Sequence, residues 1–507
     1  MPTCPTACPT APHTASKPAG GGHYRPRDPT ASVLVQVLDR HLERFEALCR
    51  ADGDEHAPPD FVFEALRAVR TCGDLTRGFV RLACDKCRAP RIVPYSCKTS
   101  VCPSCAGARM AQLAAHAVDR LLPHVPYRQW VVSLPFALRM AVAFDRDLLN
   151  DVFACATRAI LRCVESLGAE KGVAGQPAGV LHIQRFQDGA QVNPHGHFLI
   201  SDAVFVSEGP SHPSAEARAR TMTTRAPTLA EVQTVADRVE RDVLRLLERR
   251  ARAGATAESD RVRPILERLA AAKPSAETRL PNQNSGHAPS RAKSPLCARS
   301  AQGFDVHAGV TVPAHARDAL ERLLRYLARA PLPLARLSLR GNGNVVVDLK
   351  RTWSRGTVAI EYTPMAFLAR LAALVPPPRF VAARTLGVIA PNAALRPLVL
   401  PTPPPETPER PVAPPRPDRL AWADLMKRVL SLDPRHCPCG GTFRISSMID
   451  DPDVIQSIAA ALIASGHLPP HRAPRGPPRR ARRTQRPEDS AHRPKTRRRS
   501  RQPNAAS

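Results

Sequence analysis

The sequence predicts an α+β fold, because segments with strand periodicity alternate with segments of helical periodicity along the chain. Continuous or alternating apolar residues in 128–134, 179–200 and 305–312 are typical of strands. Leucines recur at helical spacing in 31–70 and again in 316–329. A cysteine-rich stretch at 72–105 precedes the main group of strands. We therefore expect an N-terminal metal-binding module followed by a sheet with helices around it.

Composition divides the 507 residues into units. Further elements are expected at 142–168 and 229–252 (helices), in three short strands between about 337 and 363, and at 364–374 (helix). The predicted order is a disordered arm at 1–30, a helical cysteine module at 31–110, a main domain at 111–400 with a low-complexity insertion at about 206–303, a proline-rich linker at 401–417, a small segment at 418–466, and a disordered basic tail at 467–507.

The chain is strongly basic, with a formal net charge of +28. Between His471 and Arg501 thirteen Lys and Arg residues face two acids, and the remaining excess is spread over the body. A cationic body with a cationic tail predicts a polyanionic partner, of which nucleic acid is the commonest. Charge alone would also fit ribosomal association or a membrane surface.

Hydropathy argues against a membrane-spanning or secreted protein, and we expect no membrane partner. No run approaches the roughly 20 apolar residues of a membrane span, and the first residues lack the apolar core of a signal peptide. We therefore expect a cytoplasmic protein, in which the 14 cysteines stay reduced and act as metal ligands or buried thiols ahead of disulfides.

Two CxxC pairs, Cys84/Cys87 and Cys102/Cys105, are separated by 14 residues. Such pairs can complete a tetrahedral zinc site, and four thiolates close the coordination sphere, so the role would be structural. This module is expected to contact DNA. Cys72 and Cys97 could replace one of these ligands, form a second partial site, or be buried thiols.

The segment GVLHIQRFQDGAQVNPHGHFLISDAVF (179–205) holds the strongest chemical signal. His195 and His197 alternate along a strand, so both imidazoles point to one face. A preceding strand could add His182 or Gln184 as a third ligand, leaving positions open for a phosphate oxygen, which suits Mg²⁺ or Mn²⁺. The alternative is a polar strand face with two half-exposed histidines.

Tyr326 lies on a predicted amphipathic helix. Four leucines form the apolar stripe, and the phenol shares the opposite face with three arginines: Leu320, Leu323, Leu324 and Leu327, against Arg322, Arg325 and Arg329. Guanidinium groups can bind phosphates and stabilise a developing phenolate. The alternative is a solvated arginine face with an incidental tyrosine.

Several motifs, in order from about residue 35 to 465, together resemble the transposases of insertion-sequence-ninety-one type, rolling-circle members of the HUH (His-hydrophobic-His) endonuclease superfamily. They are CGDLTRGFVRLACDKC…SCKTSVCPSC, RQWVVSLPFALR, QRF…NPHGHFLISDAVF, RYLARAPL, and LKRTWSRGT…FLARLAALVPPPRF…GVIAPNAALR. The resemblance implies an antiparallel sheet with the HxH strand at its centre, flanked by helices that include the tyrosine helix.

The resemblance also implies a chemistry. A divalent ion on His195 and His197 would polarise the scissile phosphate of single-stranded DNA at an element end. Tyr326 would attack the phosphate to give a 5′-phosphotyrosine and a free 3′-OH. Arg325 and Arg329 would assist, while Arg322, Lys350 and Arg351 would bind DNA. The third ligand stays open between Gln184, His182 and His307, with Gln184 favoured.

The sequence departs from the family pattern at three places. Gly196 stands between the histidines where a bulky apolar residue is usual, which would loosen strand packing. Some family members carry a second tyrosine four residues after the first. Here position 330 is Ala, so the chemistry would use a single tyrosine. Cys437-Pro-Cys439 resembles the family's CPxCGG knuckle shortened by one residue. Because CxC is a poorer chelator and no second pair follows, we expect a loop without metal there.

Two other functions compete with a transposase. A plasmid replication initiator or relaxase would share the tyrosine chemistry, but the zinc motif and the later segments argue against it. A non-catalytic zinc-dependent DNA-binding protein predicts that Tyr326 lies far from His195 and His197.

Overall fold

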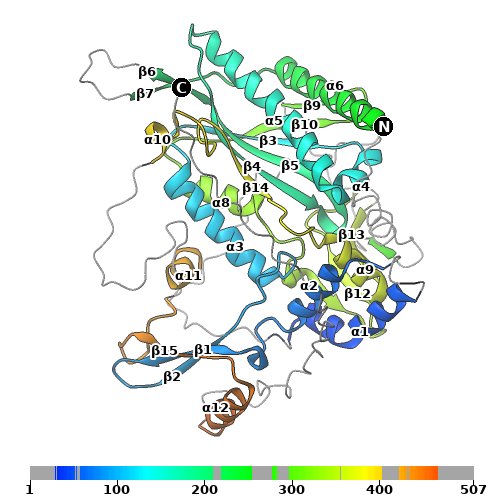
Figure 1. Cartoon of the computed structure of the whole chain (residues 1–507), viewed down its shortest axis with the longest axis vertical. Coiled ribbons are helices and arrows are strands. Elements are labelled where there is room, and N and C mark those ends of the chain that lie inside the picture. Colours follow the sequence, from blue (N-terminus) through cyan, green and yellow to red (C-terminus); the bar gives the residue numbers. More distant parts are fainter. Residues whose placement is uncertain are drawn as a thin grey trace, which may run out of the picture.

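The structure is a computed structural model of the chain (Figure 1). It describes residues 29, 31–51, 53, 57–208, 218–253, 277–281, 296–353, 356–401, 422–430 and 433–465. The predicted N-terminal arm, the proline-rich linker and the basic tail lie almost wholly outside these ranges, as does much of the predicted insertion.

The described elements alternate between helix and strand, as the α+β prediction requires. The helices are α1 (Val33–Arg50), α2 (Asp60–Arg70), α3 (Pro103–His116), α4 (Phe136–Phe144), α5 (Arg146–Ala169), α6 (Leu229–Ala253), α8 (Arg317–Leu327), α9 (Pro364–Leu374), α10 (Arg396–Val399), α11 (Trp422–Leu430) and α12 (Pro452–Ala464). Among these described helices, none combines the length and the apolar composition needed to cross a membrane.

The described strands form four antiparallel sheets. The strands are β1 (Phe79–Cys84), β2 (Pro90–Pro94), β3 (Tyr127–Ser133), β4 (Ala178–Phe186), β5 (Val192–Ser201), β6 (Ala203–Glu208), β7 (Arg218–Thr223), β8 (Glu277–Pro281), β9 (Cys297–Arg299), β10 (Asp305–Val312), β11 (Leu337–Leu339), β12 (Val345–Asp348), β13 (Thr357–Tyr362), β14 (Ala383–Gly387) and β15 (Phe443–Ile449).

The central sheet has six strands in the order β14-β4-β5-β3-β10-β9. β5, the HxH strand, lies inside this sheet between β4 and β3, as the resemblance implied. The register places His182 opposite His197 and Gln184 opposite His195. Because directly opposed residues point to the same face, all four side chains share one side of the sheet.

Helices cover both faces of the central sheet (Figure 1). On one face α5 and α6 bury an apolar layer that includes Trp130, Phe153 and Phe198. On the other face α3 and α8 pack over Tyr127 and Leu199. The alternation of β5 thus assigns Phe198 to the α5 side and the two histidines to the α8 side.

A second sheet, β11-β12-β13-β8, packs with α1, α2 and α9 into a separate apolar cluster. The Tyr362 hydroxyl on β13 donates a 2.7 Å hydrogen bond to the carbonyl of Gly189, in the turn between β4 and β5. This contact fixes the histidine hairpin against the second sheet.

The third sheet joins the two ends of the chain, in the order β15-β1-β2. β15 pairs antiparallel with β1, with Cys84 opposite Phe443. α12 covers this sheet, packing Ile455 and Leu462 against Phe79 and Ile92. The segment predicted as a separate C-terminal unit is therefore part of the cysteine module.

Two further predictions were wrong. The helix expected at 142–168 is two helices, because Asp145 ends α4 and its carboxylate accepts a 2.8 Å hydrogen bond from the Leu148 backbone as the N-cap of α5. The low-complexity insertion, in which only the helix at 229–252 was expected, also contains β7 to β9, and β8 and β9 add edge strands to two sheets.

Gly196 is tightly surrounded, contrary to the expected loose packing. A Cβ at this position would lie 2.8 Å from the rings of both Phe153 and Phe198. The two aromatic rings therefore fill the space that a bulkier residue would need, and the missing side chain is what lets α5 approach β5.

We predict that Gly196→Val, which restores the superfamily pattern, destabilises the protein by about 1–3 kcal/mol through overpacking. The midpoint of urea unfolding would measure this loss. Gly107→Ala in α3 is the matched control, because no atom lies within 4 Å of its Cβ position, and it should keep or raise stability by up to ~1 kcal/mol. Equal midpoints for Gly196→Val and the native chain would contradict this packing argument.

Candidate functional site

The two histidines of β5 form a buried pair that faces α8. His195 and His197 are each 4% exposed, and their ring centroids lie 4.8 Å apart. The alternation of the strand holds both rings on one face, while Gly196 between them faces α5. The sequence prediction of a shared face is confirmed.

Each imidazole is oriented by a hydrogen bond to one ring nitrogen. His195 Nδ1 lies 2.8 Å from the carbonyl oxygen of Asn193, so Nδ1 carries the proton and Nε2 keeps its lone pair. His197 Nδ1 lies 3.0 Å from the side-chain amide of Gln129 on β3. Its Nε2 is buried and has no hydrogen-bond partner.

Gln184 joins the histidine hairpin to the tyrosine helix. Its side-chain amide nitrogen donates to the carbonyl oxygens of Leu327 and, at 3.4 Å, Tyr326, at the C-terminal end of α8. Its Oε1 is buried without a hydrogen-bond partner. Buried acceptors are nearly always satisfied in proteins, so an unpartnered Gln184 oxygen and an unpartnered His197 nitrogen on the same face of the sheet fit a bound cation.

The three candidates for a third metal ligand differ in position. Gln184 lies opposite His195 and His182 opposite His197 on the adjacent strand, whereas His307 lies on β10, beyond β3. Within the part of the chain that the structure describes, no third histidine forms a group with the pair in which all ligand atoms lie within 4.8 Å. Gln184 and His182 each lie directly opposite one histidine of the pair, and Gln184 as the third ligand stays a prediction.

Burial keeps the imidazoles neutral. Desolvation, with a smaller contribution from Arg329, lowers the pKa of His195 to about 4. Desolvation, then His195 and Arg329, lowers the pKa of His197 well below its usual value. The pKa of His182 is also lowered to about 4, mainly by burial. At neutral pH all three rings therefore carry a lone pair that a metal ion could accept.

Tyr326 lies beside the histidine pair. Its ring centroid is 6.1 Å from that of His197, at an interplanar angle of 77°. Two cations flank the phenol: Lys350 Nζ lies 4.5 Å and Arg329 Cζ 4.9 Å from the ring centroid. The fold thus brings residues from β5, α8 and the segment after β12 together around one phenol.

The remaining predicted cations are not all at the phenol. Arg325 pairs at 2.7 Å with Glu321, a buried carboxylate one helical turn earlier on α8, so its charge is neutralised by a partner that sequence analysis missed. Arg322 is exposed on the same helix, and Arg351 is half-buried beside Lys350. Lys350, predicted to bind DNA, stacks on the Tyr326 ring.

Gln129 is a second residue that sequence analysis missed. It is fully buried in a strand whose other residues pack in the core. A polar residue within an apolar run was the available signal, because a buried amide needs partners.

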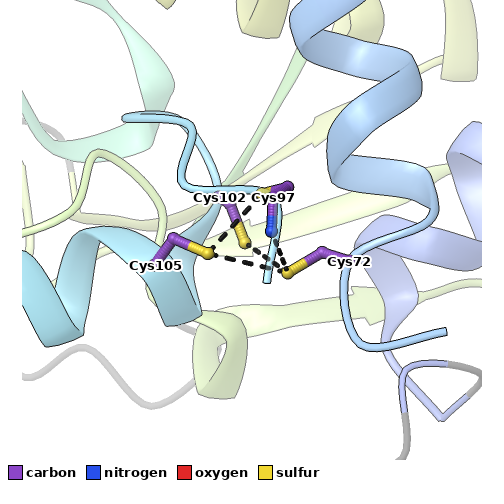
Figure 2. Close-up of side chains that lie close together, drawn as sticks. All are labelled: Cys72, Cys97, Cys102 and Cys105. Carbon is purple, nitrogen blue, oxygen red and sulfur yellow. Dashed lines mark hydrogen bonds between the residues drawn. The ribbon is translucent and has the colours of Figure 1, made fainter. Parts of the chain in front are cut away.

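The cysteines form two clusters of four. In the first, the thiols of Cys72, Cys97, Cys102 and Cys105 lie within 4.8 Å of one another (Figure 2). The sulfur of Cys72 lies 3.6 Å from those of Cys102 and Cys105, and the sulfurs of Cys97 and Cys105 are 3.5 Å apart. These distances are close to the ~3.8 Å edge of a tetrahedron with 2.3 Å zinc–sulfur bonds. The backbone N–H of Lys98 donates to the Cys105 sulfur at 3.3 Å. This donor set fits structural zinc.

The second cluster combines Cys84 and Cys87 with Cys437 and Cys439. The predicted site of Cys84, Cys87, Cys102 and Cys105 is therefore wrong. The β1–β2 hairpin directs its CxxC turn toward the start of β15, away from the start of α3, where Cys102 and Cys105 lie. All twelve described cysteines are free thiols.

Two known families match separate parts of the chain, one around the first cysteine cluster and one around the histidine site. A family described as "Transposase zinc-binding domain" matches residues 37–134, and one described as "Putative transposase" matches residues 179–395. The first range holds the whole first cluster, and the second holds the histidine pair, Gln184 and Tyr326. Neither the curated proteins nor the solved structures that were searched contain a match.

The fold, the cysteine clusters and these matches define a zinc-binding transposase, a class of protein whose partner is DNA. The zinc-binding family that matches residues 37–134 is that of insertion-sequence-ninety-one transposases, and it precedes the transposase match on the same chain. The protein therefore belongs to the transposases of insertion-sequence-ninety-one type.

The buried histidines predict a pH-dependent stability. An unfolded imidazole titrates near 6.5, whereas His195 in the folded chain has a pKa of about 4. Between these values the unfolded chain binds more protons, so stability is full above about pH 6.5 and falls as the pH decreases. From pH 7 to pH 5, His195 should account for about 2 kcal/mol of the loss.

Urea unfolding at both pH values, without added divalent ions, would measure this effect in the native chain and in His195→Gln. The variant should lose less stability on acidification. His124→Gln is the control, because His124 is exposed in the folded chain. An unchanged pH dependence in His195→Gln would refute the assignment.

Proposed function

We propose that this transposase cleaves and rejoins single-stranded DNA with Tyr326 as nucleophile, assisted by a divalent ion at His195 and His197. The observation that supports the proposal is the 6.1 Å approach of the Tyr326 ring to His197, next to two buried acceptors without partners. A non-catalytic DNA-binding protein gives no reason to bury such acceptors at a tyrosine.

The side chains that would hold the ion are His195, His197 and Gln184. When bound, Mg²⁺ or Mn²⁺ supplies Lewis-acid polarisation of the scissile phosphate. Two nitrogens and one amide oxygen leave positions for phosphate and water oxygens, as these metals prefer.

In the cleavage step the Tyr326 hydroxyl oxygen attacks the phosphorus. The new oxygen–phosphorus bond replaces the bond to the 3′-oxygen, which leaves with a proton as a free 3′-OH, while the 5′-phosphate stays on the tyrosine. Lys350 and Arg329, which flank the phenol, would stabilise the negative charge that develops on the phenolic oxygen and on the phosphate.

Rejoining is the reverse reaction with a different 3′-OH. Attack of that hydroxyl on the phosphotyrosine restores a phosphodiester and releases Tyr326. The number of phosphate ester bonds is unchanged, so no nucleotide cofactor is required. Because position 330 is Ala, one tyrosine would serve both ends in turn.

The cationic residues suit a phosphate backbone. The net charge of +28 favours polyanion binding, with an affinity that falls as salt rises. We propose element termini as the substrate, with the exposed Arg322 and the half-buried Arg351 as backbone contacts near the site. A replication initiator would share this chemistry, but the match to a transposase zinc-binding domain favours transposition.

Incubating labelled single-stranded oligonucleotides from element ends with the protein and Mn²⁺ should yield a covalent protein–DNA adduct on denaturing gels. Tyr326→Phe removes the nucleophilic oxygen and should abolish the adduct. Tyr95→Phe, in the cysteine module, is the matched control and should retain it. An adduct that persists in Tyr326→Phe would show that another residue is the nucleophile.

Gln129 should act as a positioning residue for His197. The amide nitrogen of Gln129 lies 3.0 Å from His197 Nδ1. If His197 binds the ion through Nε2, a half-turn of the amide would place its oxygen there to accept from Nδ1–H, since either end of an amide can occupy that place. Loss of such a partner typically costs 10–100-fold in metal affinity. Gln129→Met should therefore raise the Mn²⁺ concentration needed for half-maximal adduct by about 10–100-fold.

Gln233→Met, on α6 across the sheet, is the control for this measurement and should leave the Mn²⁺ requirement unchanged. A Gln129→Met protein that folds normally and needs no more Mn²⁺ than the native chain would show that this amide does not orient the ligand.

A further inference from the structure

The second cysteine cluster lies partly outside both family matches. Cys84 and Cys87 fall within the matched zinc-binding domain, but Cys437 and Cys439 lie beyond residue 395, where the transposase match ends. Sequence spacing gave Cys437 and Cys439 no partner pair, because that pair lies about 350 residues earlier in the chain.

The four sulfurs have the geometry of a tetrahedral thiolate site. The sulfur of Cys84 lies 3.5 Å from that of Cys439, and the sulfur of Cys87 lies 3.7 Å from that of Cys437. All four lie within 4.8 Å of one another. A tetrahedral zinc ion with 2.3 Å bonds separates its sulfurs by about 3.8 Å, whereas a disulfide would bring one pair to about 2.05 Å.

Both turns are shaped to present their thiols. Arg88 and Gly440, each directly after the second cysteine of its pair, have positive φ angles of 59° and 76°. These left-handed residues turn the chain back around the sulfurs. Backbone amides of Ala89 and Gly441 hydrogen-bond to the sulfurs of Cys87 and Cys439, and such donors stabilise thiolates.

Gly441, which follows the Cys437–Gly440 turn, allows the segment before β15 to approach the β1–β2 turn closely. A Cβ on Gly441 would lie 2.6 Å from the Cys84 sulfur. Around it, the Asp85 backbone N–H donates to the Thr442 carbonyl at 3.0 Å, and the Thr442 N–H donates to the Asp85 carboxylate at 2.7 Å. A short CxC pair can therefore direct both sulfurs to one point, which the sequence argument did not anticipate.

We propose that Cys84, Cys87, Cys437 and Cys439 bind a second structural zinc ion that fastens the C-terminal segment to the N-terminal module. The proposal is independent of the tyrosine chemistry. Four thiolates close the coordination sphere, so the ion has no catalytic position. Its ligands come from both ends of the chain, and so it closes the β15-β1-β2 sheet.

The fastened segment also reaches the tyrosine helix. Arg428 on α11 pairs with Glu321 of α8 at 2.6 Å and contacts Asp119 at 2.5 Å. Since Glu321 also neutralises Arg325, the second zinc holds in place a segment whose Arg428 sets the charge balance on the outer side of α8.

Metal analysis of the purified full-length chain tests the proposal. The native chain should hold two zinc ions per molecule. Cys437→Ser/Cys439→Ser should hold one, and Cys84→Ser/Cys87→Ser should lose the same ion and also hold one. Cys163→Ser, which changes a half-buried thiol on α5, is the control and should hold two.

A native chain with a single zinc would overturn the proposal whether or not any variant folds. So would a Cys437→Ser/Cys439→Ser protein that keeps two ions. Substitution with Co²⁺ gives a second measurement: thiolate charge-transfer absorption of the native chain should fall by about half in either double variant. An equal absorption in the native chain and in Cys437→Ser/Cys439→Ser would refute the second site.

Discussion

The candidate site depends on the hydrogen bonds between the Gln184 side chain and the last carbonyls of α8. A helix end has unsatisfied carbonyls, and here a buried amide on the sheet satisfies two of them. The same side chain then presents its oxygen, without a partner, on the face of His195 and His197. One residue therefore links the end of the tyrosine helix directly to the strand beside the imidazoles, in addition to the leucine packing that holds the helix on the sheet.

Elements with strong local periodicity were predictable from the sequence. The histidine hairpin, the strand at 128–134 and the leucine helix around Tyr326 are present at the expected places. Contacts between distant segments were not. Sequence spacing predicted one zinc site shared by Cys84 and Cys102, but the pairing of β1 with β15 places Cys84 in a cluster with Cys437 and Cys439. Local signals for Gln129 (a polar residue in an apolar strand) and for Glu321 (i,i+4 spacing to Arg325) were present, but their partners on other elements, His197 and Arg428, could not be read from the sequence.

The two faces of the central sheet differ in polarity and in role. The α5 side is apolar and close-packed, to the point that Gly196 has no room for a side chain. The α8 side holds the buried neutral imidazoles, and two cations, Lys350 and Arg329, flank the phenol beside them. A rigid apolar layer behind a polar layer is a sound support for metal ligands, since the rotamers of the histidines are fixed by the strand beneath them.

The sheet β15-β1-β2 has a consequence for the order of folding. The β1–β2 hairpin leaves the ribosome about 350 residues before the strand that covers its other edge. At common rates of synthesis this interval lasts on the order of tens of seconds. During that time β1 exposes an unpaired edge and two thiols, a surface prone to association with other chains. A nascent or truncated polypeptide would therefore carry an incomplete N-terminal module, and only the finished chain can close it.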